Sequence, residues 1–302
     1  MERADKWGGR CLAGAMAVLG LVLGMAGLVL LLQTGWSHRE ARFVPTEPRA
    51  ELTALLEAPR RTQADDALLF RQTGLSPTAV EELLEQGETG KEKILQAQEG
   101  FYTAPAPQCI SLIGGRFTCE DRLRNEKGKP VYGVPLAPLH PGDLLVSFST
   151  HTLGWRHGHA GLVLDAGHVL EAVQLGTNSR IKKVDHWRTY SNFLVLRVKD
   201  AAARMGQAVA DYARQVLNNV PYSLLPGILT PKDGPVEEGP GIHCAYLPWY
   251  AWNQQGVDLD ADGGPIVTVG DLARSPQLEV VQVFGLDPAL VADRQSGAAE
   301  HA

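Results

Sequence analysis

The sequence predicts an α+β protein with an antiparallel sheet, packed helices and a separate helical segment nearer the N-terminus. Three observations predict this class. Residues 49–98 show a helical periodicity of apolar side chains, residues 143–198 contain short runs rich in β-branched side chains, and residues 201–217 return to helical periodicity. Strands that precede helices and are joined by links of hairpin length are typical of α+β folds rather than doubly wound ones.

The composition supports a packed core and restricts the choice of partners. Of the 302 residues, 44% are hydrophobic and 21% are charged, which excludes wholesale disorder. The 28 Lys+Arg and 34 Asp+Glu residues give a net charge of −6, which argues against nucleic acid as the main partner. The sequence has neither a glycine-rich phosphate loop nor the ligand spacing of a zinc site, so we expect no nucleotide, metal or other cofactor.

The N-terminal segment is apolar enough to cross a membrane. Cys11–Leu32 is a run of 22 residues without charge, and as a helix it would be about 33 Å long, close to the ~30 Å bilayer core. Three basic residues precede it, which favours a cytoplasmic N-terminus. We expect residues 1–35 to form a cytoplasmic stub and a transmembrane anchor. A secretory signal cleaved near residues 35–37 is the alternative, and a buried helix of a soluble domain is a further one.

The remaining chain divides into a helical subdomain at residues 36–100 and a larger domain at residues 101–302. The subdomain begins with a polar, proline-containing tether and carries Ser76–Pro77, a typical helix start. It contains no cluster of His, Cys or carboxylate side chains with a recognisable spacing. We therefore interpret it as structural, with partner binding as the alternative, and expect the core of the larger domain at about 135–287.

The larger domain is expected to contain a sheet followed by helices. Its predicted strands are short and are separated by turn residues; they are 143–149, 160–164, 168–173, 193–198 and 278–284. Met205, Val209 and Val216 lie on one stripe of the helix predicted at 201–217. A loop rich in proline and glycine leads to a second helix at about 244–255.

Two of the four cysteines are candidates for a disulfide. Cys109 and Cys119 flank a predicted hairpin that turns at Gly114–Gly115, and facing strand ends of a hairpin lie within disulfide reach. An oxidising compartment would allow the bond to form. Two unpaired thiols are the alternative. The pairing leaves Cys244 as a candidate reactive thiol, since Cys11 belongs to the apolar run.

Three residues could form a nucleophilic site. His159 directly precedes a predicted strand and Glu171 lies twelve positions on, so the two side chains can be neighbours across an antiparallel pair. Cys244 stands where the loop enters a helix, a position whose free backbone amides favour a thiolate. A histidine beside the thiol can accept its proton, and a carboxylate behind the ring can fix the tautomer. A structural histidine and an inert buried thiol are the alternatives.

The motifs around these residues resemble one family of cysteine hydrolases, the circularly permuted NlpC-type (YiiX/YebB-like) enzymes of the papain-like superfamily. The similar motifs, in the same order, are Pro141–Val146, Gly158–Leu164, Val169–Ala172, Tyr222 and His243–Leu247. The resemblance covers about residues 135–287 and implies a papain-like α+β fold, a thioester intermediate and hydrolysis of an amide or ester. It makes Cys244 the nucleophile, His159 the base and Glu171 the orienting residue, with Tyr222 beside the pocket.

Two residues depart from the pattern of that family. Ala245 stands where a serine usually follows the nucleophile, and Pro248 cannot donate a hydrogen bond to the carbonyl of Cys244. We expect a helix start that is loosened or displaced towards Pro248, and reduced or absent activity is the alternative to full catalysis.

Other side chains near the motifs have less specific interpretations. Arg156 and His157 are candidates to line a substrate cleft, and solvent-facing loop positions are the alternative for both. His243 adjoins the nucleophile, and its side chain is expected to point elsewhere. Asp258–Gly263 begins like a calcium loop, but Val269 stands where the last ligand, a glutamate, is required, so a polar turn is expected.

The sequence therefore predicts a membrane-anchored cysteine hydrolase whose catalytic domain lies outside the cytoplasm, at a bacterial cell surface. The family resemblance implies peptide or amide bonds of the cell wall as the substrate. Lipid amides or esters are the alternative substrate for the same chemistry. A non-catalytic binding module of the cell envelope, with the same fold but no activated thiol, is the alternative from another functional class.

Overall fold

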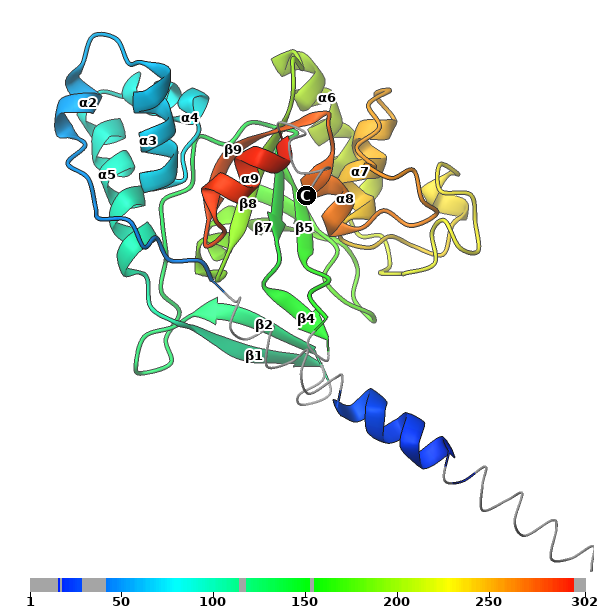
Figure 1. Ribbon diagram of the computed structural model, residues 1–302. Helices are drawn as coiled ribbons and strands as arrows, with labels where there is room; N and C mark the ends of the chain where they lie inside the picture. Colours follow the sequence, from blue (N-terminus) through cyan, green and yellow to red (C-terminus); the bar gives the residue numbers. More distant parts are fainter. Residues whose placement is uncertain (1–15, 17, 29–41, 114–117, 153–154, 296–302) are drawn as a thin grey trace, which may run out of the picture.

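The computed structural model describes residue 16 and residues 18–28, 42–113, 118–152 and 155–295. It shows an α+β protein with two sheets in which every neighbouring pair of strands is antiparallel (Figure 1). The predicted α+β class and the predicted antiparallel pairing are confirmed.

The larger sheet has six strands in the order β7-β6-β5-β3-β8-β9. Their bounds are β3 (Leu144–Ser147), β5 (His159–Asp165), β6 (His168–Glu171), β7 (Arg180–Lys183), β8 (Phe193–Val198) and β9 (Leu278–Phe284). The central strands are buried on both faces because helices cover each face. Along β3, Leu144 and Val146 pack into one hydrophobic cluster and Leu145 into the other, as the alternation of side chains along a strand requires.

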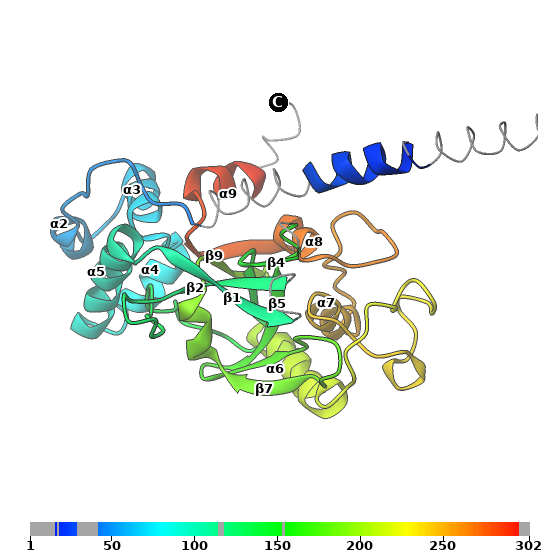
Figure 2. The same cartoon turned by 90° about the horizontal axis from the view of Figure 1, so that it is seen from below.

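Two groups of helices provide these covers. One group, α2 (Thr53–Glu57), α3 (Gln63–Thr73), α4 (Pro77–Leu84) and α5 (Glu88–Thr103), shares its core with the face that carries Leu145. The other group, α6 (Ala203–Tyr212), α7 (Tyr246–Asn253) and α8 (Val269–Arg274), packs on the face of Leu144 and Val146. Figure 2 shows α4 and α5 on one side of the central strands and α7 on the other.

Local sequence signals explain where several helices begin. Thr62 and Asp65 form a reciprocal capping box at the start of α3, and Thr268 and Asp271 do the same for α8. The side chain of Ser76 accepts a hydrogen bond from the backbone of Ala79, so the predicted helix start at Ser76–Pro77 is observed in α4. A C-terminal helix, α9 (Pro288–Gln295), was not expected from the sequence.

A smaller sheet of β1 (Pro107–Ile113), β2 (Thr118–Leu123) and β4 (Thr150–Thr152) lies beside the larger one (Figure 1). The disulfide predicted between Cys109 and Cys119 is present and joins β1 to β2, with their Cα atoms 5.6 Å apart. The predicted turn at Gly114–Gly115 lies outside the described residues. The disulfide therefore ties together two strands that already pair along their length.

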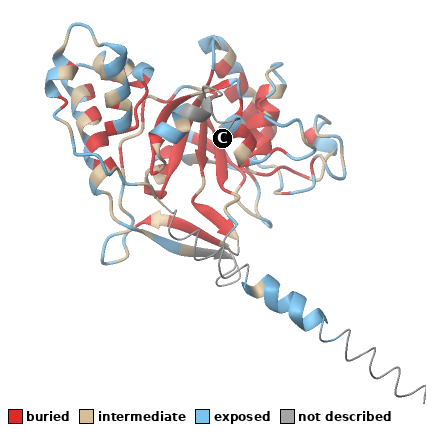
Figure 3. Ribbon diagram, viewed as in Figure 1, coloured by how far each residue is buried: buried red, intermediate tan, exposed pale blue. Residues whose placement is uncertain are grey.

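The expected transmembrane helix is contradicted. Within the predicted span Cys11–Leu32, the structure describes residue 16 and residues 18–28, and residues 18–28 are helical with almost all side chains exposed (Figure 3). No helix in the described part of the chain is both long enough and apolar enough to cross a membrane.

Candidate active site

His159 and Glu171 lie on neighbouring strands, and the register of those strands brings them together. β5 and β6 pair with Leu162 opposite Leu170, so one step further along the pair Glu171 faces Gly161. His159 is two residues before Gly161 and therefore points to the same face as Glu171. Nε2 of His159 lies 3.5 Å from Oε2 of Glu171.

Gly161 leaves the space that this arrangement needs. A Cβ atom on Gly161 would lie 2.7 Å from Cγ2 of Val169, 3.1 Å from Cγ of Glu171 and 3.3 Å from Cζ2 of Trp187. The ring of His159 is stacked on Trp187 with a 13° angle between the planes and 5.5 Å between the ring centroids. The imidazole is thus fixed from one side by an indole and from another by a carboxylate.

Glu171 is fully buried, yet it is surrounded by groups that favour its charge. Nε1 of Trp187 donates a hydrogen bond to Oε1 at 2.5 Å, Nζ of Lys182 donates to Oε2 at 2.7 Å, and Nε2 of His186 lies 2.9 Å from Oε1. Burial alone would raise the pKa of the Glu171 carboxyl, but His159 and His186 hold that pKa well below its ordinary value. Glu171 is therefore a permanent negative charge behind His159.

Cys244 approaches His159 from the other side of the sheet. It stands two residues before α7, and α7 packs on the face of β5 opposite to Glu171 and Trp187. His159 is the first residue of β5, so the thiol meets the ring at the end of the strand.

The loop before Cys244 is held in place by backbone contacts. Tyr222 pairs with Ile242 in a parallel bridge, and Gly241 has φ +119°. A Cβ on Gly241 would lie 2.2 Å from the carbonyl oxygen of Pro221, so only glycine suits this position.

α7 begins at Tyr246, two residues after Cys244, so the expected displacement of the helix start towards Pro248 is observed. The backbone N–H of Leu247 donates to the carbonyl of His243 at 3.1 Å, which closes a turn around Cys244 before the helix. Pro248 is the third residue of α7. The N–H groups of a first turn lack partners within the helix, and a proline there costs little.

The electrostatics favour an ion pair between Cys244 and His159. Burial opposes ionisation of the Cys244 thiol, but the His159 and His243 imidazoles beside it lower its pKa to about 5. Burial likewise opposes protonation of His159, but Cys244 and Glu171 raise the pKa of its ring to about 9. Between these two values the sulfur carries a negative charge and the ring a positive one.

Two further side chains lie beside the sulfur. Tyr222 is half-buried, and burial together with the charge on Cys244 raises the pKa of its phenol. His243 was expected to point elsewhere, but its ring is buried and acts directly on the thiol. Because His243 directly precedes Cys244 in the sequence, this adjacency was the signal that could have identified His243 as a residue of the site.

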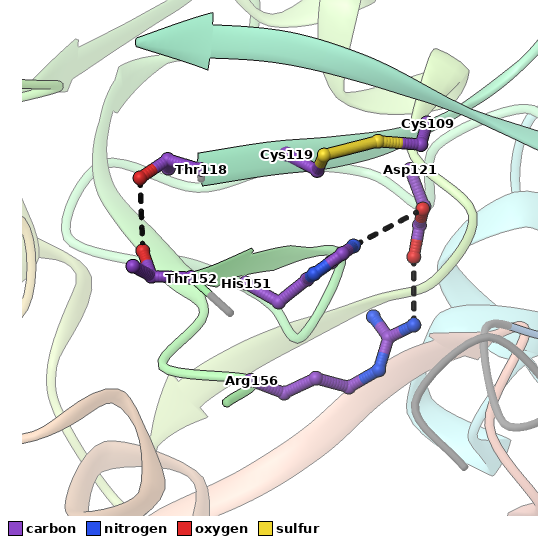
Figure 4. Close-up of a disulfide and its surroundings, with 7 residues drawn as sticks. All are labelled: Cys109, Thr118, Cys119, Asp121, His151, Thr152 and Arg156. Carbon is purple, nitrogen blue, oxygen red and sulfur yellow. Dashed lines mark hydrogen bonds and ion pairs between the residues drawn. A yellow bond between two sulfur atoms is a disulfide. The ribbon is translucent and has the colours of Figure 1, made fainter. Parts of the chain in front are cut away.

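Arg156 and His157 occupy a polar network that reaches from the disulfide hairpin to the site. Arg156 donates one hydrogen bond to the carbonyl of Phe148 at 2.8 Å and another to Asp121 at 2.7 Å, so its guanidinium is engaged by the protein (Figure 4). Nε2 of His157 lies 3.0 Å from Oγ1 of Thr152. Burial lowers the pKa of His157, and the charge on Cys244 opposes that shift. His157 is thus within electrostatic reach of the thiol.

Two clusters among the described residues have the ligand types of a metal site, and both are engaged by other groups. Cys109 and Cys119, near His151, are consumed by the disulfide (Figure 4). The second cluster consists of Asp260, Asp262 and Asp271. Asp260 forms an ion pair with Lys232, and Asp271 accepts hydrogen bonds from Thr268 and Arg274. In the turn at Asp258–Gly263, the Asp258 and Asp262 carboxylates accept hydrogen bonds from the backbone N–H groups of Asp260 and Gly264.

Comparison with known proteins gave no relatives: no family model, no curated protein and no solved structure matches this chain. The site therefore has to be interpreted from its own geometry.

Proposed function

We propose that this protein is a cysteine hydrolase that cleaves amide or peptide bonds, with Cys244 as nucleophile, His159 as general base and acid, and Glu171 as the residue that orients His159. The observation that carries the proposal is the position of the His159 ring. The Cys244 thiol interacts with this ring and raises its pKa, and Nε2 of the ring lies 3.5 Å from Oε2 of the buried Glu171 carboxylate.

The first half of the reaction forms a thioester. The Cys244 thiolate attacks the carbonyl carbon of the substrate, and the electron pair of the C=O bond moves to oxygen. The tetrahedral intermediate collapses when protonated His159 transfers its proton to the leaving nitrogen. The amine departs, and the acyl group remains on sulfur.

The second half releases the acyl group. Neutral His159 accepts a proton from water, and the resulting hydroxide attacks the thioester. Collapse of the second intermediate expels the Cys244 thiolate beside a protonated ring, which restores the ion pair. Glu171 keeps its charge throughout and stabilises the imidazolium in both halves.

A compartment outside the cytoplasm suits both the disulfide and the substrate. The Cys109–Cys119 bond persists under oxidising conditions. Peptide and amide bonds of bacterial cell-wall material are the substrates that the sequence motifs imply, and we take them as the first class to test.

A second substrate class is favoured by one surface feature. The loop that follows Tyr222 exposes large aliphatic side chains, namely Leu224, Leu225, Ile228 and Leu229. Such a cluster suits an apolar partner, so the same thiol chemistry would serve a lipid amide or ester.

The test is hydrolysis by the purified protein of two substrate sets, cell-wall stem peptides and N-acyl or O-acyl lipids. We expect the wild-type protein to cleave members of one set and Cys244→Ala to cleave none. Hydrolysis that survives Cys244→Ala would show the mechanism to be wrong. A wild-type protein that binds wall fragments without cleaving them would favour the non-catalytic module.

A further inference from the structure

His243 is held in one orientation and one tautomer. The residue is 5% exposed, and its Nδ1 accepts a hydrogen bond from the backbone N–H of Tyr246 at 3.3 Å. An imidazole nitrogen that accepts carries no proton, so the proton of the neutral ring is on Nε2. The ring therefore presents an N–H donor at its far end.

Among the described residues, the group on which the His243 ring acts is the thiol of Cys244, through a side-chain hydrogen bond. Nε2 of His243 is buried, and no nitrogen or oxygen atom of a described residue lies in hydrogen-bond geometry to it. Buried polar atoms are nearly always hydrogen-bonded, and exceptions often have a functional reason. Here the ring lies beside the thiol of Cys244, so the missing acceptor can be supplied by a ligand bound at that sulfur.

The start of α7 offers few other donors. The backbone N–H of Tyr246 is used by Nδ1 of His243, the N–H of Leu247 is used by the carbonyl of His243, and Pro248 has no N–H. An attack on a carbonyl generates an oxyanion that needs hydrogen-bond donors close to the nucleophile. Because these amides are occupied or absent, hydrogen-bond donors to the oxyanion must come from backbone N–H groups before Tyr246 or from side chains.

We propose that Nε2–H of His243 donates a hydrogen bond to the oxyanion that forms when Cys244 attacks a carbonyl group. This inference rests on the proposed function, since it requires Cys244 to be the nucleophile. His243 is then a second catalytic histidine, with a role distinct from that of His159. His159 moves protons, whereas His243 keeps its proton and stabilises charge on oxygen.

Two reactions of the same thiolate separate the roles. With p-nitrophenyl acetate, the sulfur attacks the ester carbonyl, an oxyanion forms, and its collapse expels p-nitrophenolate and leaves an acetyl thioester. With iodoacetamide, the sulfur displaces iodide from a saturated carbon, and no oxyanion forms. A donor to the oxyanion accelerates the first reaction and leaves the second almost unchanged.

The experiment measures both rates with the full chain, on the pH plateau where Cys244 is ionised, for the wild type, His243→Ala and His243→Gln. Rates of Cys244→Ala are subtracted as background. We expect His243→Ala to slow acetylation by about 100-fold and to change alkylation by less than about fivefold. The glutamine side chain retains an N–H donor and an acceptor, so the acetylation rate of His243→Gln should be at least about tenfold higher than that of His243→Ala.

The outcomes distinguish this inference from the proposed function. If the wild-type protein acetylates Cys244 and His243→Ala does so at the same rate, or if both reactions slow by the same factor, the role of His243 as an oxyanion donor is overturned while the nucleophile stands. If the wild-type protein shows no acetyl adduct at Cys244 by mass spectrometry, the proposed function fails and this inference fails with it. Retention of the Cys109–Cys119 disulfide and of the circular dichroism spectrum excludes misfolding of either variant.

Discussion

Nε2 of His159 lies 3.5 Å from Oε2 of Glu171, across the pair formed by β5 and β6. Because Glu171 is fully buried and bonded by Trp187 and Lys182, it cannot turn away from the ring. The strand pair thus fixes the distance between a permanent negative charge and the imidazole, and this relationship underlies the predictions that follow.

Removing the charge of Glu171 should lower the pKa of His159. In Glu171→Gln the ring loses the carboxylate that favours its charged form, so the basic limb of the pH–rate profile should move below its wild-type position near pH 9. The maximal rate should fall about 100-fold, in the range of general acid–base effects. The pH dependence of kcat/KM checks this.

Lys182→Met is the matched control, because it removes a neighbour of Glu171 but leaves the carboxylate in place. Its basic limb should stay near pH 9 or rise. A basic limb that is the same in Glu171→Gln and in the wild type would contradict the role assigned to Glu171.

Gly161→Ala should disturb both the fold and the site. The added Cβ would meet Val169 at 2.7 Å and Glu171 at 3.1 Å, and overpacking of this kind costs about 1–3 kcal/mol of stability. The displaced carboxylate should also reduce activity. Urea unfolding and the hydrolysis rate measure the two effects.

Gly167→Ala serves as the control on the same strand pair. The nearest atom to an added Cβ there is Oδ1 of Asp165 at 3.6 Å, an ordinary contact, so both measurements should change little. Equal stability of the two alanine variants would contradict the close packing at Gly161.

Activity should follow a bell-shaped dependence on pH. The pKa of Cys244 is lowered from 9.0 to about 5, so the thiolate is lost only as the pH falls through about 5. The pKa of His159 is raised from 6.5 to about 9, so the imidazolium is lost only as the pH rises through about 9. The reactive ion pair should therefore persist between roughly pH 5 and pH 9, and an acidic limb near pH 8 would contradict it.

Reduction of the Cys109–Cys119 disulfide should destabilise the protein. The bond closes a loop with a sequence separation of 10, for which chain entropy predicts about 3 kcal/mol. Urea unfolding with and without dithiothreitol measures this difference. The double variant Cys109→Ser/Cys119→Ser should be less stable than the wild type and insensitive to the reductant; an equally stable double variant would contradict the prediction.

The strand pairing at the site could be predicted because it depends on local features. The turn between β5 and β6 is short, and alternation along each strand then determines which side chains share a face. His159 and Glu171 follow from these two facts. The disulfide was predicted on the same basis, from cysteines near the two ends of one hairpin.

The rest of the site depends on long-range packing. Cys244 reaches His159 only because α7 packs on β5, and no local pattern specifies that contact. The groups around Glu171 come from β7 and from the 3₁₀-helix η1 (Val184–Thr189), whose placement fixes Trp187 and His186. Neither residue has a spacing that marks it as part of a site.

Two other sequence predictions were limited by the signals they used. β4 was missed because it has three residues, too few for periodicity to show. The transmembrane helix was inferred from the uncharged run Cys11–Leu32 and the basic residues before it, but no helix in the described part of the chain is long and apolar enough to span a membrane. In the described residues that helix covers 18–28.

The central claim is that the Cys244 thiol is ionised by contact with His159, and its alkylation by iodoacetamide as a function of pH tests this most directly. The wild-type rate should rise with a midpoint near pH 5, and His159→Ala should move that midpoint upward by more than about one pH unit, towards the ordinary range of a thiol. A wild-type midpoint at about 8.5 or above, or one that is unchanged in His159→Ala, would contradict the account.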